Sequence, residues 1–194
     1  MAADERLPTA IGQHLSLAGP ATGHPDNLVA MRADWIAFYD AEYHRVVRLV
    51  MRCGASLEDA RDAAEEAFTE SWALLTRHPG RWAQIRDHRS WIRAVALRKQ
   101  RRPPGPRRRP LLADNPEIPD TAAPGLEPGE LTAQTQAVLH ALRGLDHQAR
   151  AVMAFLMDGF PAPVIAQTLG ITEQRVRDVT KRARTTLRRT LAQP

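Results

Sequence analysis

The sequence is 194 residues long, enough for one or two domains, and its 43% of hydrophobic residues excludes a wholly disordered chain. Its 27 basic residues outnumber its 22 acidic ones, and nearly all of the basic residues are arginine. The positions of these arginines are therefore more informative than their number.

Several classes of protein are excluded by what the sequence lacks. No run of residues approaches the roughly 20 apolar ones that a membrane span requires, and the N-terminus has no basic segment leading into an apolar run. Cys53 is the single cysteine, so neither an internal disulfide nor a thiolate zinc site can form. No histidine pair has metal-binding spacing, and neither a glycine-rich phosphate loop nor a nucleophile–base set is present. We expect a cytoplasmic protein without membrane insertion, enzyme activity, metal or cofactor.

Residues 1–27 mix Gly, Pro, His and Ala without a period, which predicts a flexible tail. A helical pattern begins at Asn27 and ends at Gly54. This helix is the first element of a domain predicted over 28–102. Its apolar residues recur largely at steps of three and four and form one stripe, namely Trp35, Phe38, Tyr39, Val46, Leu49, Val50 and Cys53.

A second helix is predicted to begin after Ser56, a good N-cap, and to end at His78-Pro79-Gly80. Phe68 and Trp72 lie on its inner side and are expected in the core. Its other side is acidic and carries Asp59, Asp62, Glu65, Glu66 and Glu70. This acidic side is either a docking face for a basic protein partner or a merely solvated surface.

A third helix is predicted over Ser90–Arg102, because Pro103-Pro104 removes backbone donors and ends it. Residues 103–130 contain eight of the chain's 15 prolines and no periodicity, which predicts a linker between two domains. The second domain, over 131–192, again shows only helical patterns, and one of its helices is predicted to begin after the N-cap Asp146 and to end at Asp158-Gly159. We therefore expect an all-α protein made of two small helical domains.

The last two predicted helices have the spacing of a helix-turn-helix. Ile165-Ala166, Leu169-Gly170, Thr172 and Val176 describe two short helices joined by a tight turn. With Val176, Val179 and Ala183 buried, the outward side of the final helix presents Thr172, Arg175, Arg177, Asp178, Lys181, Arg182 and Arg184. Guanidinium groups at a helix start suit guanine edges and phosphates in the major groove of DNA. The alternative is a basic surface helix on an ordinary bundle.

Two further stretches bear on function. Arg93, Arg98, Lys99, Arg101 and Arg102 make the third helix basic, which suits either specific DNA contact or general attraction to phosphate. The segment at 78–89, expected to be a loop, carries Trp82 and His88. Trp82 either captures an unstacked base or simply packs against the domain.

The ordered set of these features resembles one family. The stretch from Asp59 to Trp72 (DARDAAEEAFTESW) resembles the region 2 helix of sigma-70 family factors of the extracytoplasmic-function (ECF) group, and 90–98 (SWIRAVALR) resembles the helix that follows it. Residues 139–187 resemble region 4, with Arg182-Ala183-Arg184 at its usual end. The resemblance covers most of the chain outside the tail and the linker.

The resemblance implies a dissociable subunit that directs bacterial RNA polymerase core enzyme to promoters. The acidic residues would dock on the clamp helices of the largest polymerase subunit, and the second domain would meet the flap of the second largest. The first domain would read the minus-ten element, with Trp82, His88 and the third-helix cations as candidate contacts, and the last helix would read the minus-thirty-five element. The resemblance also admits an anti-sigma factor as a partner.

The sequence departs from the family pattern at several positions. Val164 stands where an acidic residue is usual, Asp178 and Val179 stand where serine and arginine are common, and Pro103-Pro104 shortens the third helix. These departures leave the promoter sequence undetermined. Two other readings remain: a stand-alone helix-turn-helix regulator, and a protein-binding adaptor that does not use Arg175 or Arg177.

Overall fold

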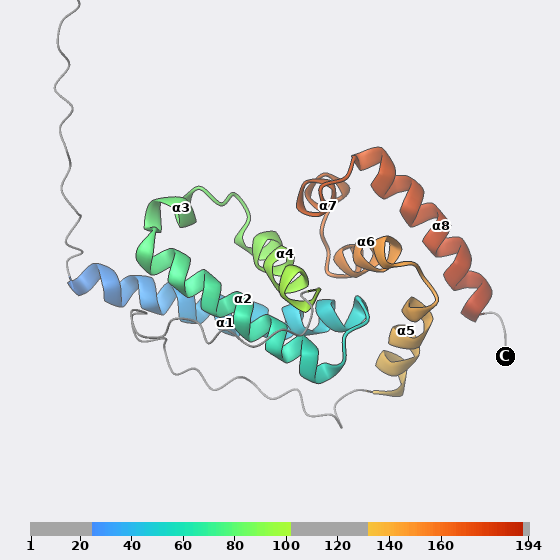
Figure 1. The fold of residues 1–194 in the computed structure, drawn as a ribbon, viewed down its shortest axis with the longest axis horizontal. Coiled ribbons are helices and arrows are strands. Elements are labelled where there is room, and N and C mark those ends of the chain that lie inside the picture. The colour runs from blue at the N-terminus through green and yellow to red at the C-terminus, as the bar shows by residue number, and fades with distance from the viewer. Residues whose placement is uncertain (1–24, 102–131, 192–194) are drawn as a thin grey trace, which may run out of the picture.

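The computed structural model describes residues 25–101 and 132–191, and all regular structure in these two ranges is α-helical (Figure 1). The first range forms a first group of helices: α1 (Pro25–Arg52), α2 (Leu57–Arg77), α3 (Pro79–Ala83) and α4 (His88–Gln100). The second range forms a second group: α5 (Ala133–Arg143), α6 (His147–Met157), α7 (Ala162–Leu169) and α8 (Glu173–Leu191). The predicted all-α class is confirmed for this part of the chain. The predicted linker, and all but the end of the predicted tail, lie outside the described residues.

Local capping determines where the helices of the first group begin. Ser56 caps α2 as predicted, and its Oγ accepts a hydrogen bond from the backbone N–H of Asp59 at 3.0 Å. Asp87 caps α4 in the same way, so that helix begins ahead of the predicted Ser90. It ends at Gln100, two residues before the predicted Arg102. The short α3 was not expected: Pro79, which stops α2, also stands in the first turn of α3, where a proline is tolerated.

Aromatic side chains form the core of the first group. The ring of Trp35 stacks on Tyr39 with centroids 5.5 Å apart, and Phe68 meets Tyr39 edge-on at 4.9 Å. The Nε1 of Trp35 donates a hydrogen bond to Ser71 Oγ at 2.9 Å, which satisfies the polar atom of this buried indole. Phe68 and Trp72 are buried, as the apolar periodicity predicted.

The second group begins with capped helices and ends in two helices joined by a tight turn. Thr132 caps α5, and Asp146 caps α6 as predicted, accepting from the N–H of Ala149 at 2.8 Å. Val176, Val179 and Ala183 turn the inner side of α8 toward α6 and α7 and are all buried. The outer side of α8 is therefore left to solvent.

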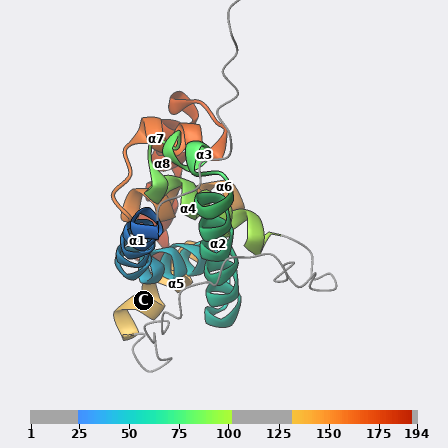
Figure 2. The same ribbon diagram turned by 90° about the vertical axis from the view of Figure 1, so that its left-hand side faces the viewer.

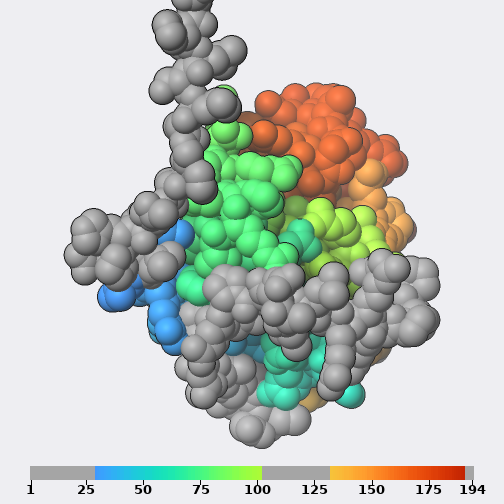
Figure 3. All heavy atoms as spheres, turned by 60° about the vertical axis from the view of Figure 1, so that its left-hand side comes forward, coloured from blue at the N-terminus to red at the C-terminus, as the bar shows by residue number. Residues whose placement is uncertain are grey.

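The two groups pack against each other, and their buried apolar residues belong to one continuous cluster. α1 contacts α5 and α6, and α4 contacts α7. In Figure 2, α1 is seen end-on, and in Figure 3 the green atoms of the first group lie directly against the orange atoms of the second. The predicted division into two domains stays a prediction, but in this structure the two groups form one body.

Among the described helices, none is both long and apolar enough to cross a membrane.

Candidate nucleic-acid interface

The turn between α7 and α8 has the geometry that the sequence predicted. Gly170 takes a left-handed backbone conformation with φ of 65°, which glycine adopts without steric cost. The N–H of Ile171 then returns to the carbonyl of Ala166 at 3.0 Å, and Thr172 Oγ1 accepts from the N–H of Arg175 at 3.1 Å. These bonds fix the direction in which α8 leaves the turn, so the start of α8 is held rigidly against α7.

All seven residues predicted to contact DNA from this module are exposed. Their hydrogen bonds run mostly to neighbours in the same helix: Arg177 donates to Gln174 Oε1 at 3.2 and 3.0 Å, and Asp178 accepts from Gln174 Nε2 at 2.9 Å. Arg175 reaches α6, where its Nε donates to Gln148 Oε1 at 2.8 Å. The guanidinium groups are thus positioned at the surface without being buried.

The basic residues of α8 form two stripes. One stripe comprises Arg175, Arg182 and Arg189, which recur every seven residues and therefore share one side of the helix. The other lines a shallow groove of about 540 Å³, whose apolar side is formed by Leu156, Ala162 and Val176. The cations of this second stripe are Arg177, Lys181, Arg184 and Arg188. The exposed surface of α8 therefore carries positive charge along two separate stripes.

In the first group, the predicted docking carboxylates and the predicted DNA-binding cations contact each other. Glu70 pairs with Arg98 at 2.7 Å and with Lys99 at 2.8 Å, and Glu66 lies 3.9 Å from the Lys99 ammonium. These pairs join α2 to α4. The carboxylates predicted to bind a protein partner and the cations predicted to bind DNA therefore partly neutralise each other's charge.

The other predicted docking residues lie along the same helix. Asp59, which belongs to the α2 cap, and Glu65 are exposed, and Asp62 is half-buried. Glu65 accepts a hydrogen bond of 3.5 Å from the Tyr43 hydroxyl. Burial of Tyr43 and the charge of Glu65 both raise the pKa of this hydroxyl, so it stays protonated as the donor.

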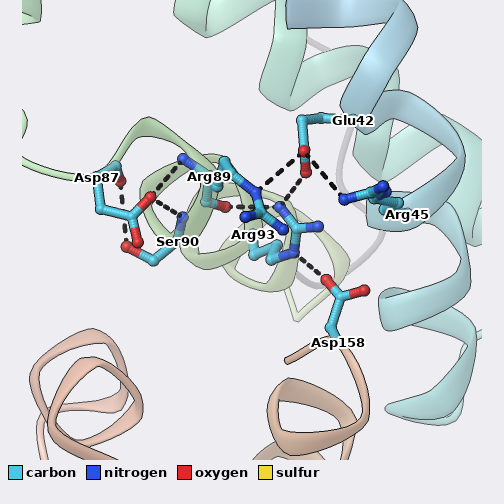
Figure 4. Close-up of polar contacts among 7 residues, drawn as sticks. All are labelled: Glu42, Arg45, Asp87, Arg89, Ser90, Arg93 and Asp158. Carbon is cyan, nitrogen blue, oxygen red and sulfur yellow. Dashed lines mark hydrogen bonds and ion pairs between the residues drawn. The ribbon is translucent and has the colours of Figure 1, made fainter. Parts of the chain in front are cut away.

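Arg93 occupies a position that the sequence did not predict. Its side chain is 0% exposed and lies between Glu42 of α1 and Asp158, the residue that follows α6 (Figure 4). Its Nη1 is 2.7 Å from a Glu42 carboxylate oxygen, and its Nε donates to Asp158. In this arrangement Arg93 has no open side toward a nucleic acid, unlike the other described cations of its set.

Trp82 and His88 lie together in an aromatic cluster. Their ring centroids are 4.1 Å apart, and His88 Nε2 is 3.1 Å from the carbonyl oxygen of Trp82. Phe38 and Trp91 meet Trp82 edge-on at 6.1 and 5.7 Å. Trp82 is half-buried, and these contacts favour packing against the domain over capture of an unstacked base.

The C-terminal end of α4 borders a groove between the two groups. Arg98 and Lys99 of α4 and Arg101, which follows α4, line it on one side, and His147 lines it from the start of α6. Burial, and then the charges of Arg101 and Arg150, lower the pKa of His147, which indicates a positive local potential. Arg102, the last cation predicted here, lies outside the described residues.

Sequence reasoning missed Glu42, Arg89 and Asp158, which surround Arg93. A signal for Glu42 was available, since it stands at the next position of the α1 stripe between Tyr39 and Val46 and is 5% exposed. A carboxylate on an apolar stripe implies a buried cation nearby. Asp158 carried no such signal, because beside Gly159 it was read only as a helix end.

No group of residues in the described ranges could hold a metal ion. No protein-family model matches the chain, and no curated protein matches it.

Proposed function

We propose that this protein binds DNA through α8. One observation carries the proposal: a helix fixed by a tight turn at Gly170 exposes its whole basic side, starting at Arg175, while its apolar side is buried. A helix of this kind can enter the major groove with its first turns toward the base edges. The second basic stripe supplies further positive charge for the phosphates on one flank.

The double variant R175A/R177A tests this proposal directly. Binding of labelled duplex DNA fragments is measured by fluorescence anisotropy at two salt concentrations, with R32A/R143A, which removes two exposed arginines from α1 and α5, as the charge-matched control. The proposal expects a large loss of affinity in the double variant and a small one in the control. Equal losses would show that α8 contributes only general charge.

We further propose that the protein is a sigma factor that binds bacterial RNA polymerase core enzyme and directs it to promoters. The support is the resemblance of 59–72, 90–98 and 139–187 to the sigma-70 family, together with an acidic α2 and a basic α8 on opposite groups. In this proposal α2 meets the clamp helices of the largest subunit, α8 reads the minus-thirty-five element and the first group acts at the minus-ten element. The flap of the second largest subunit contacts the second group.

The geometry adjusts this proposal at two points. Glu66 and Glu70 already pair with α4, so we propose Asp59 and Glu65 as the first residues to meet a basic partner, with Glu66 and Glu70 joining when Lys99 and Arg98 are displaced. Among the described cations, the proposed minus-ten contacts of the packed structure are Arg98, Lys99 and Arg101, since Arg93 is buried, and Arg102 stays a proposed contact. The site of action is the cytoplasm, and the proposed role is binding rather than catalysis.

Run-off transcription with purified core polymerase on a set of genomic fragments tests the sigma proposal. The expected result is initiation from specific fragments that requires both core enzyme and this protein. Changing Glu65, an exposed residue proposed to meet the partner first, to lysine should weaken binding to core polymerase while leaving the helical content unchanged. A stand-alone regulator predicts instead tight binding to a symmetric operator as a dimer, without core enzyme.

A further inference from the structure

The junction between the two helix groups is built around charged side chains. Arg93 of α4 is fully buried between Glu42 and Asp158 (Figure 4). The ring of Phe160 packs against the guanidinium groups of Arg93 and Arg89. The Phe160 ring centroid is 5.0 Å from the Cζ of Arg93 and 5.5 Å from that of Arg89. Glu42 and both arginines belong to the first group, whereas Asp158 and Phe160 belong to the second.

This junction is an inefficient way to fill a core permanently. Removing a charge from water is costly, and a buried ion pair often stabilises a protein no more than apolar residues of the same volume do. The net stabilisation by this buried ion pair is reduced further, because Arg93 Nη2 is buried without a hydrogen-bond partner. Separation of the two groups would return Asp158 and one side of Arg93 to water, which offsets part of the lost contact.

The charges around Arg93 show what this separation would create. The Glu42 carboxylate that pairs with Arg93 also pairs with Arg45 and Arg89. Its Oε1 lies 3.6 Å from Arg45 Nη1 and 3.1 Å from Arg89 Nε. Asp87, the remaining carboxylate in Figure 4, caps α4 by accepting from the N–H groups of Arg89 and Ser90. Once Asp158 leaves, three guanidinium groups surround one carboxylate, and the surplus of positive charge favours an anion.

We propose that Arg93 is a phosphate-binding residue for nucleic acid and that Asp158 masks it while the two groups are packed together. A backbone phosphate takes the place of the Asp158 carboxylate, and Arg89 and Arg45, half-exposed already, bind beside it. The proposal rests on the proposed function, because it names a further DNA contact and its regulation. In this proposal, DNA binding by the first group is regulated by whether the second group is packed against it.

Asp158→Asn tests the masking, since it removes the charge at nearly constant volume and leaves Arg93 paired with Glu42. Asp40→Asn, an exposed position on α1, is the charge-matched control. Hydrogen exchange followed by mass spectrometry on the full chain, without DNA, reports the junction. We expect α4 and the peptide around Phe160 to exchange roughly ten- to a hundredfold faster in Asp158→Asn than in the control, while α2 stays unchanged.

The second arm measures binding of a non-specific DNA duplex as a function of salt. One additional phosphate contact steepens the plot of log affinity against log salt by about 0.9, so Asp158→Asn should be steeper than Asp40→Asn by roughly one unit. Adding Arg93→Gln to Asp158→Asn should remove this gain. Unchanged exchange overturns the masking, and faster exchange without a steeper slope overturns the role of Arg93 as a phosphate contact. If neither the wild type nor any variant binds DNA, the proposed function fails as well, and the exchange arm still decides whether Asp158 holds the junction.

Discussion

α4 and α8 are both arginine-rich helices, and their sequences alone suggest the same role in binding DNA. In the structure they differ. The cations of α4 meet carboxylates from other elements, namely Glu42, Glu66, Glu70 and Asp158. The carboxylates beside the basic side of α8 are its own Glu173 and Asp178. Whether an arginine is available to a partner therefore depends on what the neighbouring helices carry.

The position of each helix explains the difference. α4 packs against α1, α2 and α7, so its faces look toward several elements. α8 packs its inner side against α5, α6 and α7 and has nothing described on its outer side. An enclosed basic helix must have its charges paired, because unpaired buried charge is strongly unfavourable, whereas an exposed one need not.

The sharpest test of this comparison is the loss of the buried cation. Arg93→Met should destabilise the protein by about 3–5 kcal/mol, because the largely buried Asp158 loses its counter-ion and Glu42 loses its one fully buried partner. Arg182→Met on the exposed side of α8 should change stability by no more than about 0.5 kcal/mol. Urea unfolding followed by circular dichroism measures both. A loss below about 1 kcal/mol for Arg93→Met would mean that α4 does not depend on this pairing.

The next test exploits the exposure of α8. Arg175→Ala or Arg177→Ala should weaken binding to a preferred DNA sequence by about 1–3 kcal/mol if the residue contacts a base edge. Unfolding stability should stay within about 0.5 kcal/mol of the wild type, since neither side chain is buried. Competition with a mismatched duplex separates base reading from phosphate contact. Equal loss on both duplexes would assign the residue to phosphate.

Local features of the fold were predictable from the sequence, whereas contacts between distant elements were not. Ser56, Asp146 and Gly170 each act within a few residues of their own position, so capping and turn chemistry predicted them correctly. The burial of Phe68 and Trp72 followed from helical periodicity.

The burial of Arg93 depends on residues 51 positions before it and 65 after it in the sequence, and no local pattern specifies such pairs. The exposure of the DNA-binding residues predicted on α8 follows from local helical periodicity, whereas the pairing of the cations on α4 depends on residues distant in the sequence. Only Glu42, on an apolar stripe, gave a local sign of the buried charge.

Smaller effects are expected where α2 covers α4. Glu70→Gln removes the carboxylate that Arg98 and Lys99 share, and because these pairs are partly exposed to water the loss of stability should stay below about 1 kcal/mol. The two released cations should steepen the salt dependence of non-specific DNA binding by roughly one to two units. Asp34→Asn on α1 is the charge-matched control. An unchanged slope relative to this control would show that the pairs with Glu70 do not restrain α4.

The smallest effect is expected at the C-terminal end of α4, where Arg101 and His147 line the same groove. Burial and the charges of Arg101 and Arg150 lower the pKa of His147 from its ordinary 6.5, so the unfolded chain binds this proton more readily than the folded one. The contribution of His147 to stability is therefore present above pH 6.5 and declines as the pH falls below it. In a nuclear magnetic resonance titration, Arg101→Gln should raise the pKa of His147 toward 6.5, whereas Arg182→Gln on α8 should leave it where it is. No change with Arg101→Gln would mean that burial alone sets this pKa, and that this end of α4 lacks the positive potential that it is expected to share with α8.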